Sequence, residues 1–97
     1  MYTPLPETLT IKNSEIHGLG LFATADIVAG LVLGVSHVVD ERFENKHIRT
    51  PLGGFYNHSE NPNCCTVKDG DLVYLKTLKD IKAGEEITSR YVLYMPL

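Results

Sequence analysis

The chain is poor in cysteine and in clustered positive charge, and both shortages exclude classes of protein. It has two cysteines, Cys64 and Cys65, which are adjacent in a sequence of 97 residues. That spacing is typical of neither a disulfide scaffold nor a thiolate metal site, so we expect small residues on a buried strand. The formal net charge is −3 and lysine and arginine form no cluster, so nucleic acid is not expected as a direct ligand.

Long apolar runs are also absent. No segment approaches the roughly 20 apolar residues that cross a bilayer, and residues 1–6 lack the basic and apolar regions of an export signal. We therefore expect a soluble intracellular protein without membrane contact, cytoplasmic or, in a eukaryotic host, nuclear. The histidines lack the spacing of metal-ligand pairs, and we predict no metal site. They are His17, His37, His47 and His58.

Helix-length amphipathic periodicity is absent as well, which favours a mainly β fold. Residues 9–12 and 72–78 alternate between apolar and polar, and residues 31–35 form a short β-branched run. Each of these patterns predicts a strand. Asp69-Gly70 lies between two strand-like runs and predicts a hairpin in which about 64–68 pairs with 72–78.

Two further features concern the organisation of the chain. The single helical candidate is a turn or two around Asp40–Asn45. The segments Asp26–Gly30 and Asp80–Gly84 share the pattern Asp-Ile-x-Ala-Gly, and each is expected to be a tight turn with an aspartate cap and a glycine at positive φ. No linker divides the chain, so we expect residues 1–97 to form one domain.

Three short motifs contain residues suited to ligand binding. Gly18-x-Gly20 precedes an apolar strand, where it forms a turn or exposes backbone groups to a ligand. The run Asn57–Asn63 is polar, and inside a small fold its groups need partners, which a cofactor could supply. Gly84-Glu85-Glu86-Ile87 leads to Tyr91. In this order and spacing, the three motifs resemble the signature of the SET-domain protein-lysine methyltransferases, from about residue 9 to residue 94.

The resemblance implies a fold and an activity. The implied fold is the SET-domain, β-clip-like arrangement of small β-sheets, with little helix and a C-terminal segment threaded beneath a loop. The implied cofactor is S-adenosyl-L-methionine, and the implied reaction transfers its methyl group to the ε-amine of a lysine in a protein or peptide. The alternative is that this chain has lost catalytic turnover and acts as a SET-like module that binds a protein or peptide.

The resemblance also assigns roles to residues. The backbone of His17, Gly18, Leu19 and Gly20 would hold the methionine part of the cofactor, Asn57 its amino or carboxylate group, and His58 the adenine side. Ser59 and Asn63 would lock the loop by side-chain to backbone bonds. For His58 the alternative is a structural histidine.

Tyrosines are assigned to the reacting centre. Tyr91 would be the catalytic residue and would also contact the cofactor, orienting the lysine amine rather than deprotonating it; the alternative is a core tyrosine. Tyr56 and Tyr94 would line the lysine channel, or would be packed in the core. Glu85 and Glu86 are expected to be solvated or to stabilise a turn.

The chain departs from the family pattern in four places. Gly53-Gly54-Phe55-Tyr56 stands where the family often has an arginine, and Arg90 stands where it often has an acidic residue or asparagine. The insert at 39–52 is short, and the sequence reaches Leu97 with no cysteine-rich tail. We therefore expect the lysine channel to be closed by the tail at 94–97 or by a second subunit, which makes a homodimer a hypothesis.

Overall fold

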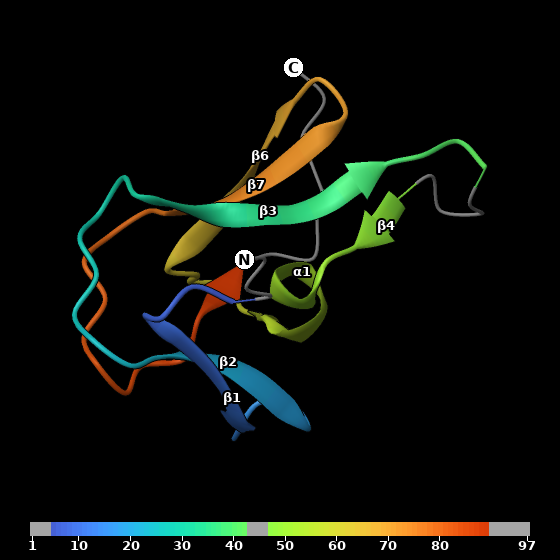
Figure 1. Ribbon diagram of the computed structural model, residues 1–97. Helices are drawn as coiled ribbons and strands as arrows, with labels where there is room; N and C mark the ends of the chain where they lie inside the picture. Colours follow the sequence, from blue (N-terminus) through green and yellow to red (C-terminus); the bar gives the residue numbers. More distant parts are fainter. Residues whose placement is uncertain (1–4, 43–46, 90–97) are drawn as a thin grey trace.

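The fold is built from short strands and one short helix in the part of the chain that the computed structural model describes, residues 5–42 and 47–89 (Figure 1). This confirms the mainly β prediction. In chain order the elements are β1 Leu9–Asn13, β2 Leu19–Ala23, β3 Val32–Val39, β4 His47–Arg49, α1 Pro51–Phe55, β5 Asn57–His58, β6 Cys64–Asp69, β7 Leu72–Thr77 and β8 Thr88–Ser89.

The largest sheet has four strands in the order β4-β3-β7-β6. The predicted hairpin is confirmed, because β6 and β7 are antiparallel from Cys64 opposite Thr77 to Asp69 opposite Leu72. Gly70 lies in the two-residue turn with φ 62°, a conformation that glycine adopts without steric cost. In β7 the buried residues alternate with half-buried ones, so one face of the strand packs on the core.

Two small sheets complete the fold. Strands β1 and β2 form an antiparallel hairpin, and the chain around Glu86 returns along the other edge of β2. The Ala23 amide donates to the Glu85 carbonyl at 2.9 Å, and the Ile87 amide donates to the Leu21 carbonyl at 2.7 Å. Immediately afterwards β8 pairs in parallel with β5. The segment that follows Gly84 therefore joins the hairpin to β5.

The helix does not form where the sequence predicted it. Residues Asp40–Arg42 form no helix, because the Asp40 side chain accepts from the Arg42 amide at 3.0 Å, a local bond that competes with helical ones. The rest of the predicted segment, 43–46, lies outside the described residues. The helix is α1, where Thr50 is the N-cap and Pro51 occupies the first turn, as proline does readily. In the described residues no helix is long and apolar enough to cross a membrane.

Helix α1 packs closely on β3 through a glycine. A Cβ on Gly53 would overlap the backbone carbonyl oxygen of Ser36 and lie 3.1 Å from Cε1 of His37. The neighbouring Gly54 has nothing within 4 Å of its equivalent position. Close packing at Gly53 therefore fixes α1, and with it the start of β5, against the large sheet.

The core joins most of these elements. Its buried apolar residues come from both hairpins, β3, α1 and the Asp-Ile-x-Ala-Gly segments. Cys64 is fully buried among them, as predicted, whereas Cys65 is only half-buried. Burial raises the pKa of the Cys64 thiol to about 12. The core cluster is made up of Leu9, Leu21, Ala23, Ile27, Leu33, Leu52, Tyr56, Cys64, Leu75, Ile81 and Ile87.

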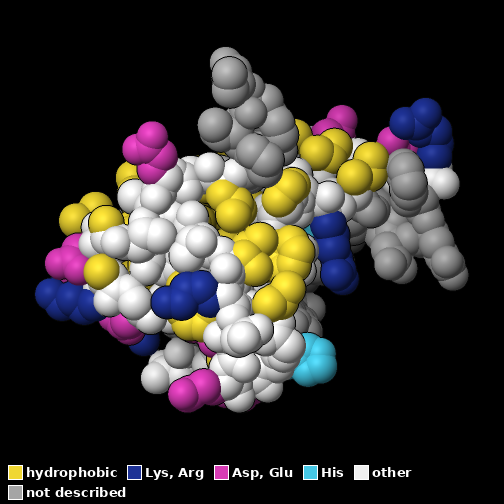
Figure 2. All heavy atoms as spheres, turned by 60° about the horizontal axis from the view of Figure 1, so that its bottom comes forward, with side chains coloured by type: hydrophobic (Ala, Val, Ile, Leu, Met, Phe, Trp, Pro, Cys, Tyr) yellow, Lys and Arg dark blue, Asp and Glu magenta, His cyan; other side chains and the backbone are white. Residues whose placement is uncertain are grey.

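The outer surface carries charges of both signs. Figure 2 shows hydrophobic side chains gathered over the middle of one face, with acidic and basic side chains scattered around them. On that face the described side chains form no basic patch.

The two Asp-Ile-x-Ala-Gly segments lie side by side. Ile27 and Ile81 are antiparallel bridge partners, with amide-to-carbonyl distances of 2.7 Å and 2.8 Å. Gly30 and Gly84 have φ values of 79° and 91°, which confirms the predicted positive φ. Both isoleucines are buried, so the repeat closes one end of the core.

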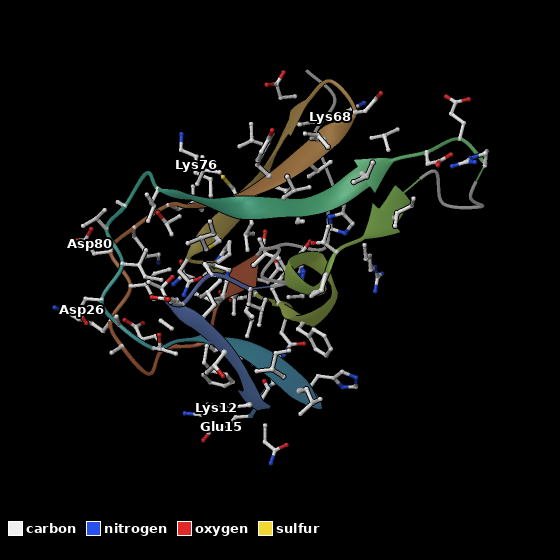
Figure 3. The ribbon with its side chains drawn as sticks, viewed as in Figure 1. Lys12, Glu15, Asp26, Lys68, Lys76 and Asp80 are labelled. Atoms are coloured by element: carbon white, nitrogen blue, oxygen red, sulfur yellow. The ribbon has the colours of Figure 1, made fainter. Side chains whose placement is uncertain are left out.

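The sequence predicted that each aspartate caps its own turn, and the structure differs. Asp80 accepts from the amide of Ala29, and Asp26 accepts from the amide of Ala83, each at 2.9 Å. Figure 3 shows the two labelled aspartates in adjacent loops. Each aspartate therefore caps the other copy, and the repeat is a reciprocal clamp that fixes where the segment after Ala83 begins.

The packing of α1 predicts a large difference between two adjacent glycines. Gly53→Ala is expected to lower the free energy of unfolding by about 2 kcal/mol, because the added methyl must displace backbone. Gly54→Ala, the matched control, is expected to be neutral or to stabilise by up to about 1 kcal/mol, since alanine is the better helix former. Urea unfolding of both variants measures the difference, and equal stabilities would contradict the close packing.

Candidate functional site

The three motifs of the sequence meet at one place in the structure. The pairing of β5 with β8 sets Asn57 opposite Thr88 and His58 opposite Ser89. The segment around Glu86 lies against β2, with Phe22 opposite Glu86. The glycine-rich turn, the polar run and the C-terminal segment therefore share one cluster of polar groups.

The Asn57 side chain lies at the centre of this cluster, and the residue is 4% exposed. Its Nδ2 lies 2.7 Å from Oε2 of Glu86 and 3.1 Å from Oγ of Ser14. It also lies 3.2 Å from the carbonyl oxygen of His17 and 3.3 Å from that of Leu19. An amide nitrogen carries two hydrogens, so these four acceptors exceed the hydrogens that Asn57 offers them.

This surplus also fixes the orientation of the Asn57 amide. Oxygen and nitrogen of an asparagine are assigned from their surroundings, and an oxygen turned toward four acceptors would be repelled. Nδ2 therefore faces the cluster, and Oδ1 lies on the opposite side of the same planar group. The cluster is a concentration of acceptors, which suits a cationic amine.

Ser14 and Glu86 belong to the cluster although the sequence did not predict them. The Ser14 hydroxyl lies 2.8 Å from both carboxylate oxygens of Glu86. The same oxygen accepts from the amide of Ile16 at 2.9 Å, and the Ser14 amide donates to the Gly18 carbonyl at 2.8 Å. Ser14 thus holds both the turn and the carboxylate.

The two adjacent glutamates have different roles, which partly corrects their interpretation as solvated or turn-stabilising residues. Glu85 accepts from the Lys82 amide at 2.7 Å and does stabilise the turn. Glu86 is half-buried and contacts Asn57 and Ser14. Its side chain is part of the polar cluster.

The two glycines of the turn also differ. Gly18 has φ 50°, so it serves the turn. A Cβ on Gly20 would overlap Oε2 of Glu86 and lie 3.0 Å from Cβ of Ser14. The group that approaches Gly20 is therefore a side chain of this chain, and the glycine leaves room for the carboxylate.

The predicted locks of the polar loop are present. Asn63 Nδ2 donates to the Glu86 carbonyl at 2.8 Å, and its Oδ1 accepts from the Thr88 amide at 2.9 Å. Ser59 Oγ accepts from the Asn61 amide at 3.1 Å. Asn63 therefore ties the loop to both sides of Ile87.

His58 lies at the edge of the cluster. Its Nε2 lies 3.0 Å from Oε1 of Glu60, and its side chain is 38% exposed. The Ser59 amide donates to the Ser89 carbonyl at 3.1 Å, which continues the pairing of β5. The contact with adenine stays a prediction.

The tyrosines are only partly described. Tyr56 is 5% exposed within the core cluster, and its ring meets that of His37 edge-on at 6.5 Å; its place in a lysine channel stays a prediction. Tyr91 and Tyr94, together with Arg90, lie outside the described residues. Within 5–42 and 47–89 no group of three His, Cys, Asp or Glu side chains could hold a metal ion.

Comparison with known proteins gives one consistent result. The SET domain family model matches residues 34–92. A SET domain-containing protein of Acanthamoeba polyphaga mimivirus is 45% identical over 85 residues, which cover 84% of this chain and 33% of that protein. A SET and MYND domain-containing protein of Dictyostelium discoideum is 40% identical over 43 residues, 44% of this chain and 11% of that protein. The chain thus spans a third or less of these two curated relatives.

Solved structures agree on the fold. The methyltransferase domain of human PR domain-containing protein 2 superposes with a TM-score of 0.76 at 21% identity, covering 96% of this chain and 80% of that one. A Plasmodium falciparum protein assigned as a histone methyltransferase gives 0.69 at 19% identity, covering 90% and 95%. The predicted SET-domain fold of small sheets is confirmed.

The bonds of Asn63 predict a contrast between two asparagines of one loop. Asn63→Ala is expected to lower the free energy of unfolding by about 2 kcal/mol, because it leaves half-buried backbone groups at Glu86 and Thr88 without partners. Asn61→Ala, at an exposed position, is expected to change it by less than about 0.5 kcal/mol. Urea unfolding of the pair tests this, and similar losses would contradict the locking role.

Proposed function

Because the chain belongs to the SET domain family, we propose that it is a protein-lysine N-methyltransferase that uses S-adenosyl-L-methionine. The family consists of methyltransferases that act on lysines in proteins and use this cofactor. The observation that carries the proposal is the Asn57 amide surrounded by acceptors where the three motifs meet. We further propose that residues 1–97 form a single minimal SET domain.

The acceptor cluster fits one end of the cofactor. The methionine part carries an ammonium group with three N–H donors and a positive charge. The carbonyl oxygens of His17 and Leu19 and the carboxylate of Glu86 offer acceptors in excess of the hydrogens of Asn57. His17, Gly18, Leu19, Gly20 and Asn57 would hold this end.

The remaining roles follow the family pattern. His58, half-exposed on β5, would meet the adenine. Tyr91 would contact the cofactor and orient the substrate amine, and Tyr94 would line the channel. Tyr56, which is buried against the core cluster, would line the channel with it.

The rate of methyl transfer would depend more on the orientation of the substrate amine than on proton transfer. When bound, the cofactor supplies a methyl group on a cationic sulfur, open to attack by a neutral amine. A free lysine has a pKa of about 10.4, so presenting it neutral near pH 8 costs about 3 kcal/mol. An apolar channel lowers that pKa by desolvation, and orientation of the amine by Tyr91 would contribute the larger share of the rate. Glu86 is engaged by Asn57 and Ser14, so we give it no role as a base.

The partner of such an enzyme is a lysine-containing protein or peptide. A homodimer that completes the channel remains a hypothesis. The alternative function is an interaction module that binds the cofactor without turnover, and it is motivated by the short insert at 39–52. Cofactor binding without transfer to any lysine-containing protein would identify the alternative.

Cofactor binding is expected to depend on Asn57. Calorimetric titration with S-adenosylhomocysteine should show binding to the parent protein and at least roughly tenfold weaker binding to Asn57→Ala, which loses the amide at the centre of the cluster. Asn61→Ala is the matched control and should bind as the parent does. Equal affinities of Asn57→Ala and parent would contradict the assigned pocket.

Methyl transfer is expected to depend on Tyr91. Tyr91→Phe removes one hydroxyl and should lower transfer from labelled cofactor to lysine-containing proteins by roughly 100-fold, the usual effect of losing one hydrogen bond at a reacting centre. Binding of S-adenosylhomocysteine and the circular dichroism spectrum should stay close to those of the parent. Undiminished transfer by this variant would refute the catalytic assignment.

A further inference from the structure

Among the contacts of the Asn57 amide nitrogen with the described residues, the one to the carboxylate of Glu86 is the shortest, 2.7 Å, and this carboxylate also meets the Ser14 hydroxyl. Charge-assisted hydrogen bonds of this kind are roughly twice as strong as neutral ones. The backbone of Glu86 is held in place on both sides, by the bridge to Phe22 and by the bond from the Ile87 amide to Leu21. Its position is therefore fixed by the sheet.

The opposite strand is adapted to this carboxylate. Any side chain at residue 20 would overlap Oε2 of Glu86, and Gly20 has none. Gly20 needs no positive φ, so conformational freedom does not explain the glycine, whereas room for Glu86 does. The hydrogen bonds hold the carboxylate, and the missing Cβ leaves room for it where it lies.

A carboxylate gives the cluster two properties. It accepts and never donates, so it holds the Asn57 amide with Nδ2 toward the cluster. Among the described groups that contact Nδ2, the carboxylate is the charged one. The others are a hydroxyl and two backbone carbonyls. A ligand with an ammonium group gains from that charge, and a ligand without one does not.

We propose that Glu86 is a positioning residue that fixes the Asn57 amide and makes the pocket selective for ligands with a cationic amine. The inference rests on the proposed function for the identity of the ligand, S-adenosylmethionine or its product. The fixing of Asn57 is independent of any ligand, so it can be tested on the free protein.

The first test observes the side-chain amide of Asn57 by NMR in the free protein. Glu86→Gln keeps the size and one acceptor oxygen but removes the charge. We expect the Asn57 amide signals to shift and to exchange with water several-fold faster than in the parent. Glu85→Gln, on the exposed turn, changes the net charge equally and should leave the signals in place. Unchanged Asn57 signals in Glu86→Gln would overturn the positioning role.

A second variant covers the case in which Glu86→Gln does not fold. Ser14→Ala removes the hydroxyl that contacts both carboxylate oxygens and Nδ2 of Asn57 itself, and it should change the Asn57 signals in the same direction by a smaller amount. No change in the Asn57 signals of this variant would overturn the network that the proposal requires.

The second test compares two ligands by calorimetry. S-adenosylhomocysteine carries the amino acid end, and 5′-methylthioadenosine has the same nucleoside and sulfur without it. We expect Glu86→Gln to weaken binding of S-adenosylhomocysteine roughly tenfold and to leave 5′-methylthioadenosine within about twofold. Glu85→Gln should change neither affinity.

The outcomes separate this inference from the proposed function. Equal losses for both ligands would indicate general collapse of the pocket and overturn the selectivity, as would no loss for either. If the parent binds S-adenosylhomocysteine and Glu86→Gln binds it as well as the parent does, the proposed cofactor stands and the inference fails. If the parent binds neither ligand, the cofactor assignment and the selectivity fail together, and the Asn57 spectra alone decide the positioning role.

Discussion

The structure depends on how the segment after Gly84 is held. This segment bonds first to the edge of β2, through Ala23 and Leu21, and then pairs as β8 with β5. Both contacts join parts of the chain that are far apart in sequence, so local preference does not create them. They bring the glycine-rich turn and the polar run to one place, and the reciprocal clamp of the two Asp-Ile-x-Ala-Gly segments sets where the crossing begins.

Local signals predicted most of the strands. The hairpin of β6 and β7 follows from Asp69-Gly70 and from the alternation of 72–78, which short-range geometry determines. The helix was misplaced, because the Asp40 side chain bonds to Arg42 while α1 is fixed by Thr50 and by packing on β3. A five-residue helix owes little to propensity and much to tertiary contacts, which a single sequence does not display.

The sequence predicted those parts of the candidate site that lie in local motifs. It did not predict the parts that depend on contacts between distant residues. Asn57 and the glycine-rich turn were identified from the family resemblance, and the structure brings them together. Ser14 and Glu86 were missed, since they are 72 positions apart in sequence and neither has a local pattern that indicates the other. The available signal was Gly20, a glycine in a strand, which often marks the close approach of another group.

We propose that the acceptor cluster around Asn57 receives the amino group of the cofactor. A crystal structure of the protein with S-adenosylhomocysteine tests it most directly. We expect the amino nitrogen within hydrogen-bonding distance of the His17 and Leu19 carbonyl oxygens, with the Glu86 carboxylate beside it. An amino group that points to solvent, or a ligand bound elsewhere on the protein, would contradict it.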